Sequence, residues 1–389
     1  MAGTIKPRDA KELRQAVEWA LNDGVTLDVR GQGSKLALGK PMRCDQVLDL
    51  SGLSGVVDYA PEELVVTLRA GTPLSEVEAL LAQRNQMLAF EPPDLGPLLG
   101  LEAGQGTLVG AVMGNLAGSR RVSAGAARDH LLGFRGVNGR GEAFKSGGKV
   151  MKNVTGYDLS KLLAGSWGTL AVLDEVSIKV LPAPDQTRTL LLLGLADEAA
   201  VKVMCAALGS PHDVSGAAHV GDRTALRIEG VAPSVEARLR GLRDLLRASG
   251  AKMEELGTLE SRAFWREVRD VAPLKADQDA IVWKISCPPT EGPGIVTRIK
   301  ARRPAAETFY DWSGGLIWLA LPTSADADHE IVRGALGSAG GHATLIRAAE
   351  SVRASVPVFQ PQPTALAALA SRVKESFDPK RLFNPGRMT

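Results

Sequence analysis

Glycine is concentrated in one stretch of this chain. Of its 42 glycines, 17 fall between residues 96 and 168, where apolar and charged residues are interleaved throughout. Glycine adopts left-handed backbone conformations without steric cost, and its lack of a Cβ lets a second backbone or a ligand come close. We therefore expect many tight turns in this stretch, and we expect its backbone to approach a bound molecule.

Length and charge restrict the class of protein. At roughly 150 residues per domain, 389 residues predict two domains or three. The net charge is only +2, which lacks the basic surface that nucleic-acid binding needs. No apolar run approaches the roughly 20 residues of a membrane-spanning helix, and residues 1–11 lack the apolar core of a secretory signal. We expect a cytoplasmic protein with no nucleic-acid partner and no membrane span of its own.

The cysteines and histidines show no metal-binding pattern. Cys44, Cys205 and Cys287 lie far apart, whereas an iron–sulfur cluster held by cysteine alone needs four thiolates. None of the five histidines is at a metal-ligand spacing from another. The sequence therefore predicts no metal in this chain, and buried, inert thiols are expected.

Hydrophobic periodicity divides the chain near residues 182–184, a Pro-Ala-Pro stretch. Before this point it predicts a helix at 8–24, strands at 25–30, 46–50 and 63–70, a helix from 73 to about 84, a hairpin at 131–148 and a strand at 168–182. Beyond it, residues 187–257 and 281–347 each show a strand–helix–strand–strand–helix–strand pattern, and a last helix is predicted at about 363–376. Two such halves predict an antiparallel sheet backed by helices.

The first candidate motif is the loop at residues 30–35, Arg-Gly-Gln-Gly-Ser-Lys, which follows a predicted strand. Successive backbone N–H groups in such a loop can form a concave anion site, to which Ser34 and Lys35 can add charge-assisted contacts. Leu36 replaces the third glycine of a dinucleotide-binding fingerprint, and a P-loop pattern is absent. Taken alone, the loop fits a phosphate site and a surface turn equally well.

Two further motifs are weak when taken alone. Glycine recurs at every fourth position from Gly106 to Gly118, a spacing that also occurs where helices pack tightly. Residues 149–159 and 165–170 combine polar turn residues with short apolar pieces, which is typical of a structured loop that enters a strand.

Together and in this order, the three motifs resemble the FAD-binding domain of the vanillyl-alcohol oxidase/p-cresol methylhydroxylase (PCMH) superfamily. The chain is especially similar to FAD-binding subunits of glycolate oxidase in its length and in the loop at 30–35, AGTPL (70–74), AGAARD (124–129), KNVTGYDLSKLLAGSWGTL (152–170) and FDPKRLFNPGRM (377–388). The resemblance covers residues 1–184 and the C-terminal tail strongly and the middle weakly. Val109 and Ala171 depart from it, because relatives often carry glycine there, and a side chain now occupies that space.

The resemblance implies an α+β fold. A two-lobed PCMH-type FAD-binding domain would span 1–184, a cap domain of two ferredoxin-like halves would span 185–354, and a tail at 355–389 would return to the first domain. It also implies one FAD, held non-covalently because loop 30–39 has no His, Cys or Tyr. By position, the cofactor-binding residues would be Arg30, Gly31, Gln32, Gly33, Ser34, Lys35, Thr107, Gly110, Gly114, Gly118, Ser119, Asp129, Gly168, Thr169, Val172 and Asn384. Asp129 could instead form a cap or ion pair, and Asn384 could instead form a turn.

Oxidation of a 2-hydroxy acid needs a cation for the carboxylate and a base for the hydroxyl. The candidates in the middle of the chain are Arg223, Arg227, Lys284, His342 and Arg347. Exposed Arg and Lys are more often solvated surface residues, and the sequence shows no base and cation that converge. We therefore expect slow turnover of a hydroxy acid by the isolated chain.

The resemblance implies a subunit of a multi-subunit glycolate oxidase. FAD would pass electrons to an iron–sulfur subunit, and a homologous flavin subunit of the same complex could oxidise the hydroxy acid. Two alternatives remain open at this point: a stand-alone FAD-dependent 2-hydroxy-acid dehydrogenase, and a structural subunit that has lost flavin, which only Val109 and Ala171 support. Such a complex would be cytoplasmic, or peripheral at the inner face of the membrane through its partners.

Overall fold

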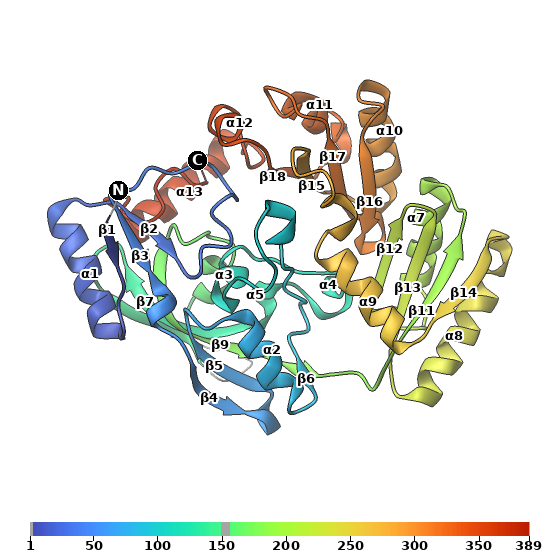
Figure 1. Ribbon diagram of the computed structural model, residues 1–389, viewed down its shortest axis with the longest axis horizontal. Coiled ribbons are helices and arrows are strands. Elements are labelled where there is room, and N and C mark those ends of the chain that lie inside the picture. The colour runs from blue at the N-terminus through green and yellow to red at the C-terminus, as the bar shows by residue number, and fades with distance from the viewer. Residues whose placement is uncertain (1–2, 149–155, 389) are drawn as a thin grey trace.

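The computed structural model describes residues 3–148 and 156–388. Two bodies lie side by side (Figure 1): an amino-terminal part, made of elements β1 to β10, and a cap, made of β11 to β18. The motif at 149–159 and the run at 152–170 both begin outside the described residues. The red C-terminal segment leaves the cap and returns to the blue amino-terminal end.

Strands of the amino-terminal part form a small parallel sheet and a larger antiparallel one. The parallel sheet has the order β1-β3-β2, with bounds Gly3–Ile5, Gln46–Asp49 and Leu27–Arg30. The antiparallel sheet has the order β4-β5-β9-β7-β8, with bounds Val56–Ala60, Val65–Arg69, Ala171–Lys179, Leu131–Asn138 and Ala143–Gly147. A short antiparallel pair joins β6 (Gln86–Met87) and β10 (Leu181–Pro182).

Helix α1 (Ala10–Asp23) forms where the sequence predicts it. The Asp9 carboxylate accepts a hydrogen bond from the Glu12 N–H, and Gly24 ends the helix in a left-handed conformation with φ 68°. The buried side chains Leu13 and Val17 lie one turn apart and pack into the core. The other helices of this part are short: α2 (Leu74–Ala82), α3 (Leu108–Met113), α4 (Arg121–Ala124), α5 (Ala127–His130) and α6 (Leu159–Leu163).

The cap is built on one eight-stranded sheet in the order β14-β11-β13-β12-β16-β17-β15-β18. The strands are β11 (Gln186–Leu193), β12 (Gly216–Val220), β13 (Arg223–Gly230), β14 (Lys252–Leu256), β15 (Ile281–Ser286), β16 (Glu307–Asp311), β17 (Leu316–Leu321) and β18 (His342–Arg347). Each half has four strands. Counted from the outer edge of the sheet inward, their order is the fourth, first, third and second strand of that half in the sequence. The halves join where β12 pairs with β16. The α+β class and the two ferredoxin-like halves are thus confirmed, whereas the domain boundaries at 184 and 354 stay a prediction.

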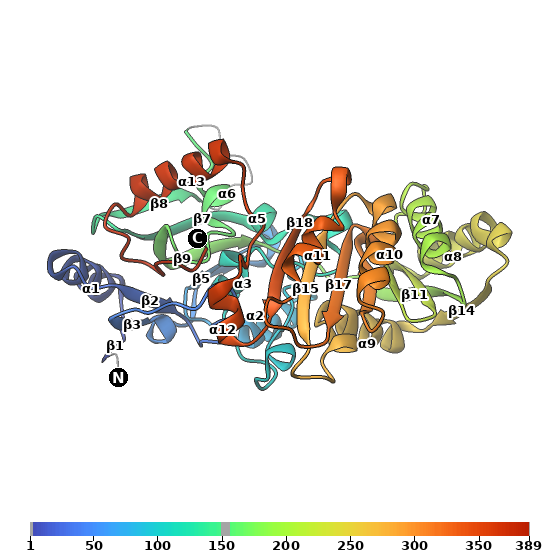
Figure 2. The same cartoon turned by 90° about the horizontal axis from the view of Figure 1, so that it is seen from above.

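Helices and the amino-terminal part cover opposite faces of the cap sheet. On one face lie α7 (Asp197–Leu208), α8 (Ala232–Leu246), α10 (Gly292–Arg302) and α11 (His329–Gly334), in one buried cluster. The other face forms a second cluster with α9 (Thr258–Arg269) and with loops of the amino-terminal part. Figure 2 shows this arrangement from above. The second cluster joins the two bodies through apolar contact.

The C-terminal segment begins with α12 (Glu350–Ser355) and α13 (Thr364–Phe377) and then follows β2. The Leu27 N–H donates to the Leu382 carbonyl oxygen at 2.8 Å, and the Asn384 N–H donates to the Leu27 carbonyl oxygen at 3.0 Å. Leu382 and Phe383 are buried in the core of the amino-terminal part. The chain end therefore belongs structurally to its beginning.

Candidate functional site

One cleft in the amino-terminal part gathers most of the residues that the sequence assigns to a cofactor. It is open to solvent along one side. The predicted residues that line it are Arg30, Gly31, Gln32, Gly33, Ser34, Lys35, Thr107, Gly110, Gly114, Gly168, Val172 and Asn384. Trp167, Ala171, Val109, Met113 and Arg387 also line it. Segments from both ends and the middle of the chain thus build one site.

The loop at 31–35 is fitted closely against the start of α3. A Cβ at Gly31 would lie 2.8 Å from Thr107 Cγ2, and Gly33 has a φ of 79° that side chains rarely adopt. The Gly106 N–H donates to Gln32 Oε1 at 2.7 Å. Thr107 Oγ1 in turn accepts from the Gly110 N–H at 3.0 Å. The glycines in this loop are needed for turn geometry and close approach.

Two cations at this loop have no carboxylate partner among the described residues. Burial lowers the pKa of Lys35 to about 8, against the raising effect of Asp94, and the charge of Arg387 lowers it further. Lys35 Nζ reaches only Ser34 Oγ, at 3.3 Å. The Arg387 side chain is buried and donates to the Lys35 carbonyl oxygen at 2.6 Å, while its Nε has no partner. Buried cations without a counterion favour binding of an anion, and the pyrophosphate of FAD fits this requirement.

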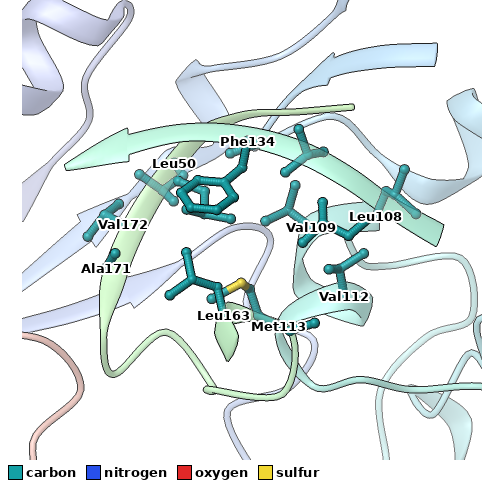
Figure 3. Close-up of a cluster of buried hydrophobic side chains, with 14 of the residues drawn as sticks. Leu50, Leu108, Val109, Val112, Met113, Phe134, Leu163, Ala171 and Val172 are labelled. Carbon is teal, nitrogen blue, oxygen red and sulfur yellow. The ribbon is translucent and has the colours of Figure 1, made fainter. Parts of the chain in front are cut away.

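The opposite side of the cleft is apolar. Figure 3 shows Val109, Met113, Ala171 and Val172 in a cluster of buried side chains around Phe134. Val109 and Ala171 are the two positions that depart from the resemblance, yet both line the cleft and it stays open beside them. Their side chains therefore contribute to an apolar wall of the cleft.

Asn384 connects three of the segments that form the cleft. Its Oδ1 accepts from the Val29 N–H at 2.8 Å, and its Nδ2 donates to the Trp167 carbonyl oxygen at 2.9 Å. A Cβ at Gly168 would lie 2.8 Å from Nδ2. The amide is buried, and the φ of Asn384 is 42°. Asn384 thus lines the cleft and also has the left-handed backbone of a turn, while its contact with FAD stays a prediction.

Four predicted cofactor residues do not line this cleft: Gly118, Ser119, Asp129 and Thr169. Ser119 Oγ donates to Asp311 Oδ2 of the cap at 2.7 Å, and the Gly118 carbonyl oxygen accepts from Trp312 Nε1 at 3.0 Å. Thr169 Oγ1 donates to the Ser166 carbonyl oxygen.

Asp129 is used for local structure instead. Its carboxylate accepts from the Ala126 N–H at 2.9 Å and pairs with Lys161 Nζ at 3.2 Å. Although burial opposes the shift, these contacts lower the pKa of Asp129. The geometry matches the cap and ion-pair alternative for this residue.

Two of the five candidates for substrate binding have side chains that are bound to other parts of the protein. Arg227 is buried and pairs with Glu91, with contacts of 2.8 Å and 3.0 Å between guanidinium and carboxylate. Arg347 donates to the Ala280 and Leu98 carbonyl oxygens, both at 2.8 Å. Both guanidinium groups therefore have partners already. A third candidate, Arg223, lies over the Phe264 ring at 5.2 Å.

The remaining two candidates, Lys284 and His342, point to the same face of the cap sheet, because β15 pairs with β18 in the register Lys284↔Thr344 and Ser286↔His342. Lys284 Nζ lies 5.3 Å from the centre of the Trp312 ring, and Arg121 of α4 lies 4.5 Å from the same centre. Lys284 and His342 therefore share one face of the sheet, and their part in catalysis stays a prediction. Arg121 is not among the residues that the sequence indicated, although it belongs to the basic pair that follows the glycine-spaced motif.

Residues 3–148 and 156–388 contain neither a cluster of metal ligands nor a membrane-spanning helix. No group of three or more His, Cys, Asp or Glu side chains could hold a metal ion there. No helix in this part of the chain is both long enough and apolar enough to span a bilayer.

Comparisons with known proteins agree with this geometry. Residues 1–147 match the family described as FAD binding domain. The structure of p-cresol methylhydroxylase with substrate bound aligns with a TM-score of 0.71 over 99% of this chain and 88% of that one, at 11% identity. This likeness shows the fold. The fold is that of PCMH-type flavoproteins, and the sequence relatives make this chain an FAD-dependent oxidoreductase.

Two relatives narrow this class. The glycolate oxidase subunit GlcE of Escherichia coli K12 is 35% identical over 379 residues, which cover 97% of each protein. The glycolate oxidase subunit GlcD of Bacillus subtilis is 30% identical over 190 residues, covering 49% of this chain and 39% of that protein. The chain belongs to the family of the glycolate oxidase subunit GlcE. The resemblance inferred from the sequence motifs is confirmed.

Proposed function

We propose that this chain is the FAD-binding subunit of a multi-subunit glycolate oxidase, a 2-hydroxy-acid dehydrogenase, and that electrons pass from its FAD to an iron–sulfur partner subunit. The observation that carries the proposal is the cleft itself, where two cations without a carboxylate partner among the described residues face an apolar wall. The E. coli relative is named as a subunit of glycolate oxidase, which supports the complex. Three cysteines are too few for a four-thiolate cluster, which supports a separate iron–sulfur subunit.

Different residues of the cleft would contact different parts of FAD. Lys35 and Arg387 would hold the pyrophosphate by charge, and the backbone of the loop at 31–34 would add N–H donors. The wall that contains Val109, Met113 and Val172 would exclude water from the ring system. When bound, FAD supplies the acceptor for the two electrons taken from a substrate, while the protein supplies orientation and electrostatics.

Purification of the complex from the native host tests the subunit assignment. We expect this chain to co-purify with a homologous flavin subunit and an iron–sulfur subunit, with flavin and iron both present by analysis. Acid precipitation should release the flavin of this chain to the supernatant. A chain that purifies alone from the host, without iron and with full activity, would contradict the proposal.

A stand-alone 2-hydroxy-acid dehydrogenase is the second candidate, and the convergence of Lys284, His342 and Arg121 favours it. The isolated, FAD-loaded chain distinguishes the two candidates in an assay with glycolate or lactate and a dye acceptor. Slow dye reduction supports the subunit, whereas rapid reduction supports the stand-alone enzyme. The flavin-free structural subunit loses its basis, because Val109 and Ala171 leave the cleft open.

A further inference from the structure

We propose that Asp94 is a positioning residue for the cofactor: its carboxylate holds the loop at 95–106 against Lys35 and supplies the negative charge that faces this lysine. The part of Lys35 as a ligand of the FAD pyrophosphate rests on the proposed function. The arrangement of Asp94, the loop and Lys35 rests on the geometry of the amino-terminal part.

This loop runs exposed to solvent between two fixed ends. Residues 100–105 are all exposed. Before them, Leu98 is buried, and its carbonyl oxygen accepts from Arg347 of the cap at 2.8 Å. After them, the Gly106 N–H donates to Gln32 Oε1 at 2.7 Å. The middle of the loop therefore depends on other contacts for its position.

The Asp94 carboxylate supplies these contacts. Its Oδ1 accepts from the Gly96 N–H at 3.0 Å, and its Oδ2 accepts from the Gly104 N–H at 2.6 Å. The Asp94 N–H donates to Asp270 Oδ1, at the end of α9, at 2.9 Å. Gly104 has a φ of 79°, which other residues rarely adopt. One carboxylate thus joins the two sides of the loop, and α9 holds its backbone in place.

The loop ends directly beside the lysine of the cofactor cleft. A Cβ at Gly106 would lie 2.9 Å from Ser34 Oγ and 3.2 Å from Lys35 Nζ. Gly106 is only two residues from Gly104, which Asp94 binds. A shift of the loop would therefore move the backbone against which the Lys35 ammonium group packs.

Asp94 also acts on Lys35 by charge. Both residues line a groove between α2 and α9, which is joined to the cofactor cleft at Lys35. Burial lowers the pKa of Lys35 to about 8; Asp94 opposes this effect, and Arg387 of the tail adds to it. No ion pair joins Asp94 to Lys35 in the described part of the chain. The carboxylate therefore favours the charged lysine without occupying the N–H donors that a phosphate would use.

Most other charged residues of the groove are bound to one another. They form two groups of ion pairs, Arg269 with Asp270 and Glu78, and Glu91 and Glu229 with Arg120 and Arg227. Arg262 and Arg266 are exposed to solvent. Asp94 is thus the acid whose charge is directed at the lysine.

The pH dependence of FAD affinity tests the charge of Asp94. Fluorescence titration of the full-length chain with FAD is repeated across neutral and alkaline pH. Asparagine keeps one of the two hydrogen bonds to the loop but removes the charge. We expect the fall in FAD affinity to occur about half a pH unit to one unit lower in Asp94→Asn than in the wild type, because loss of the carboxylate lowers the pKa of Lys35 further.

Gly104→Ala separates the loop from the charge. Alanine disfavours a φ of 79°, while no atom lies within 4 Å of its Cβ and the Asp94 carboxylate remains. We expect FAD affinity to fall about 3- to 10-fold at every pH, with the pH of the fall unchanged. Wild-type affinity in this variant would overturn the role of the loop.

Glu102→Gln is the matched control for charge, because Glu102 is an exposed acid of the same loop that does not line the groove. It should bind FAD with the affinity and pH dependence of the wild type. The charge role of Asp94 is overturned if Asp94→Asn has the wild-type pH dependence, or if Glu102→Gln shifts it equally.

The titration of Lys35 itself gives a measurement that needs no FAD. NMR of the flavin-free chain with isotope-labelled lysine follows it, and the Lys35 signal is the one that Lys35→Arg removes. A chain that binds no FAD, but in which Asp94→Asn lowers the pKa of Lys35, contradicts the proposed function and supports the role of Asp94. A chain that binds FAD, but in which the pKa of Lys35 is the same with and without the carboxylate, contradicts the role of Asp94 and leaves the flavin assignment intact.

Discussion

A single lysine at the cleft determines much of its charge. Lys35 Nζ is close to the Ser34 hydroxyl and has no carboxylate partner within residues 3–148 and 156–388. We expect Lys35→Met to weaken FAD binding about 10- to 100-fold, the loss of one charge-assisted contact. Fluorescence titration of the flavin-free protein measures this change. Lys35→Arg should retain most of the affinity, and Lys40→Met, outside the cleft, should bind FAD normally.

The same lysine predicts how FAD affinity depends on pH. Burial lowers the pKa of Lys35 to about 8 in the flavin-free protein, so the side chain is charged below that pH. The pyrophosphate favours the charged form, and FAD affinity should therefore be constant below about pH 7 and fall as the pH rises through 8. In Lys35→Arg the fall should disappear, because arginine keeps its proton. An identical fall in both proteins would show that another group is responsible.

Some residues of the site could be assigned from the sequence and others could not. The loop at 30–35 was recognisable because glycine, hydroxyl and lysine occur together within a few residues. Arg387 was missed, since it reaches the loop only by contact with the Lys35 carbonyl oxygen, 352 residues away in sequence. Ser119 was placed at the cofactor by position, but its hydroxyl is bound to Asp311 of the cap. The contacts of Arg387 with Lys35 and of Ser119 with Asp311 join residues that are far apart in the sequence, so no short sequence motif predicts them.

At the scale of elements, the C-terminal tail connects separate segments that form the cleft, through the side chain of Asn384. We expect Asn384→Ala to lower the free energy of unfolding by about 1 to 3 kcal/mol and to reduce bound FAD. The substitution leaves the Val29 N–H and the Trp167 carbonyl oxygen without their partner in a buried place. Urea unfolding and flavin content measure both effects. Asn384→Gly is the control for backbone strain, since glycine tolerates a φ of 42° but lacks the amide.

Truncation after Ser376 removes the end of the tail and so tests its part in FAD binding and in stability together. It removes the buried Leu382 and Phe383 and the Asp378 carboxylate, which accepts from both of their N–H groups at 2.9 Å. FAD affinity and melting temperature should fall together. If both stay unchanged, the tail has no part in forming the cleft.

Elements with regular patterns were predictable, and those shaped by tertiary contact were not. Helix α1 has its cap residues and its apolar spacing in the local sequence, and the two halves of the cap alternate strands and helices clearly. The strand expected at 168–182 begins only at Ala171, because Gly168 turns the chain at a φ of 69° beside Asn384. Helix α9 was not assigned, although Phe264, Trp265 and Val268 already gave it one apolar face.

At the scale of the whole molecule, four charged residues connect the amino-terminal part to the cap. Glu91 and Arg120 come from the first and Arg227 and Glu229 from the second, and the Arg120 guanidinium contacts Glu229 at 2.8 and 2.9 Å. The side chains are largely buried. Any movement of the cap relative to the FAD cleft must therefore break these largely buried ion pairs.

These ion pairs predict sensitivity to acid. Burial alone would raise the pKa values of Glu91 and Glu229, but Arg227 and Arg120 outweigh it and hold both below the usual value. A carboxyl with a lowered pKa stabilises the folded state above its unfolded pKa of about 4.3, and this stability is lost as the pH falls further. We expect the melting temperature to drop steeply below about pH 4. In Glu91→Gln the protein should be less stable at pH 7, and the drop should be shallower.

Arg227→Met tests whether the buried pairs hold the two bodies together. Removal of one partner leaves Glu91 with an incompletely compensated buried charge, and such a change destabilises proteins by about 3 to 5 kcal/mol. The double variant with Glu91→Met removes both charges, so we expect it to recover part of that loss. Arg243→Gln is the control, because its contact with Glu255, 2.7 Å long, lies at the surface, where such pairs contribute about 0 to 1 kcal/mol. Thermal unfolding of the FAD-loaded proteins provides the comparison, and equal melting temperatures for Arg227→Met and Arg243→Gln would show that the interface is held by the apolar cluster instead.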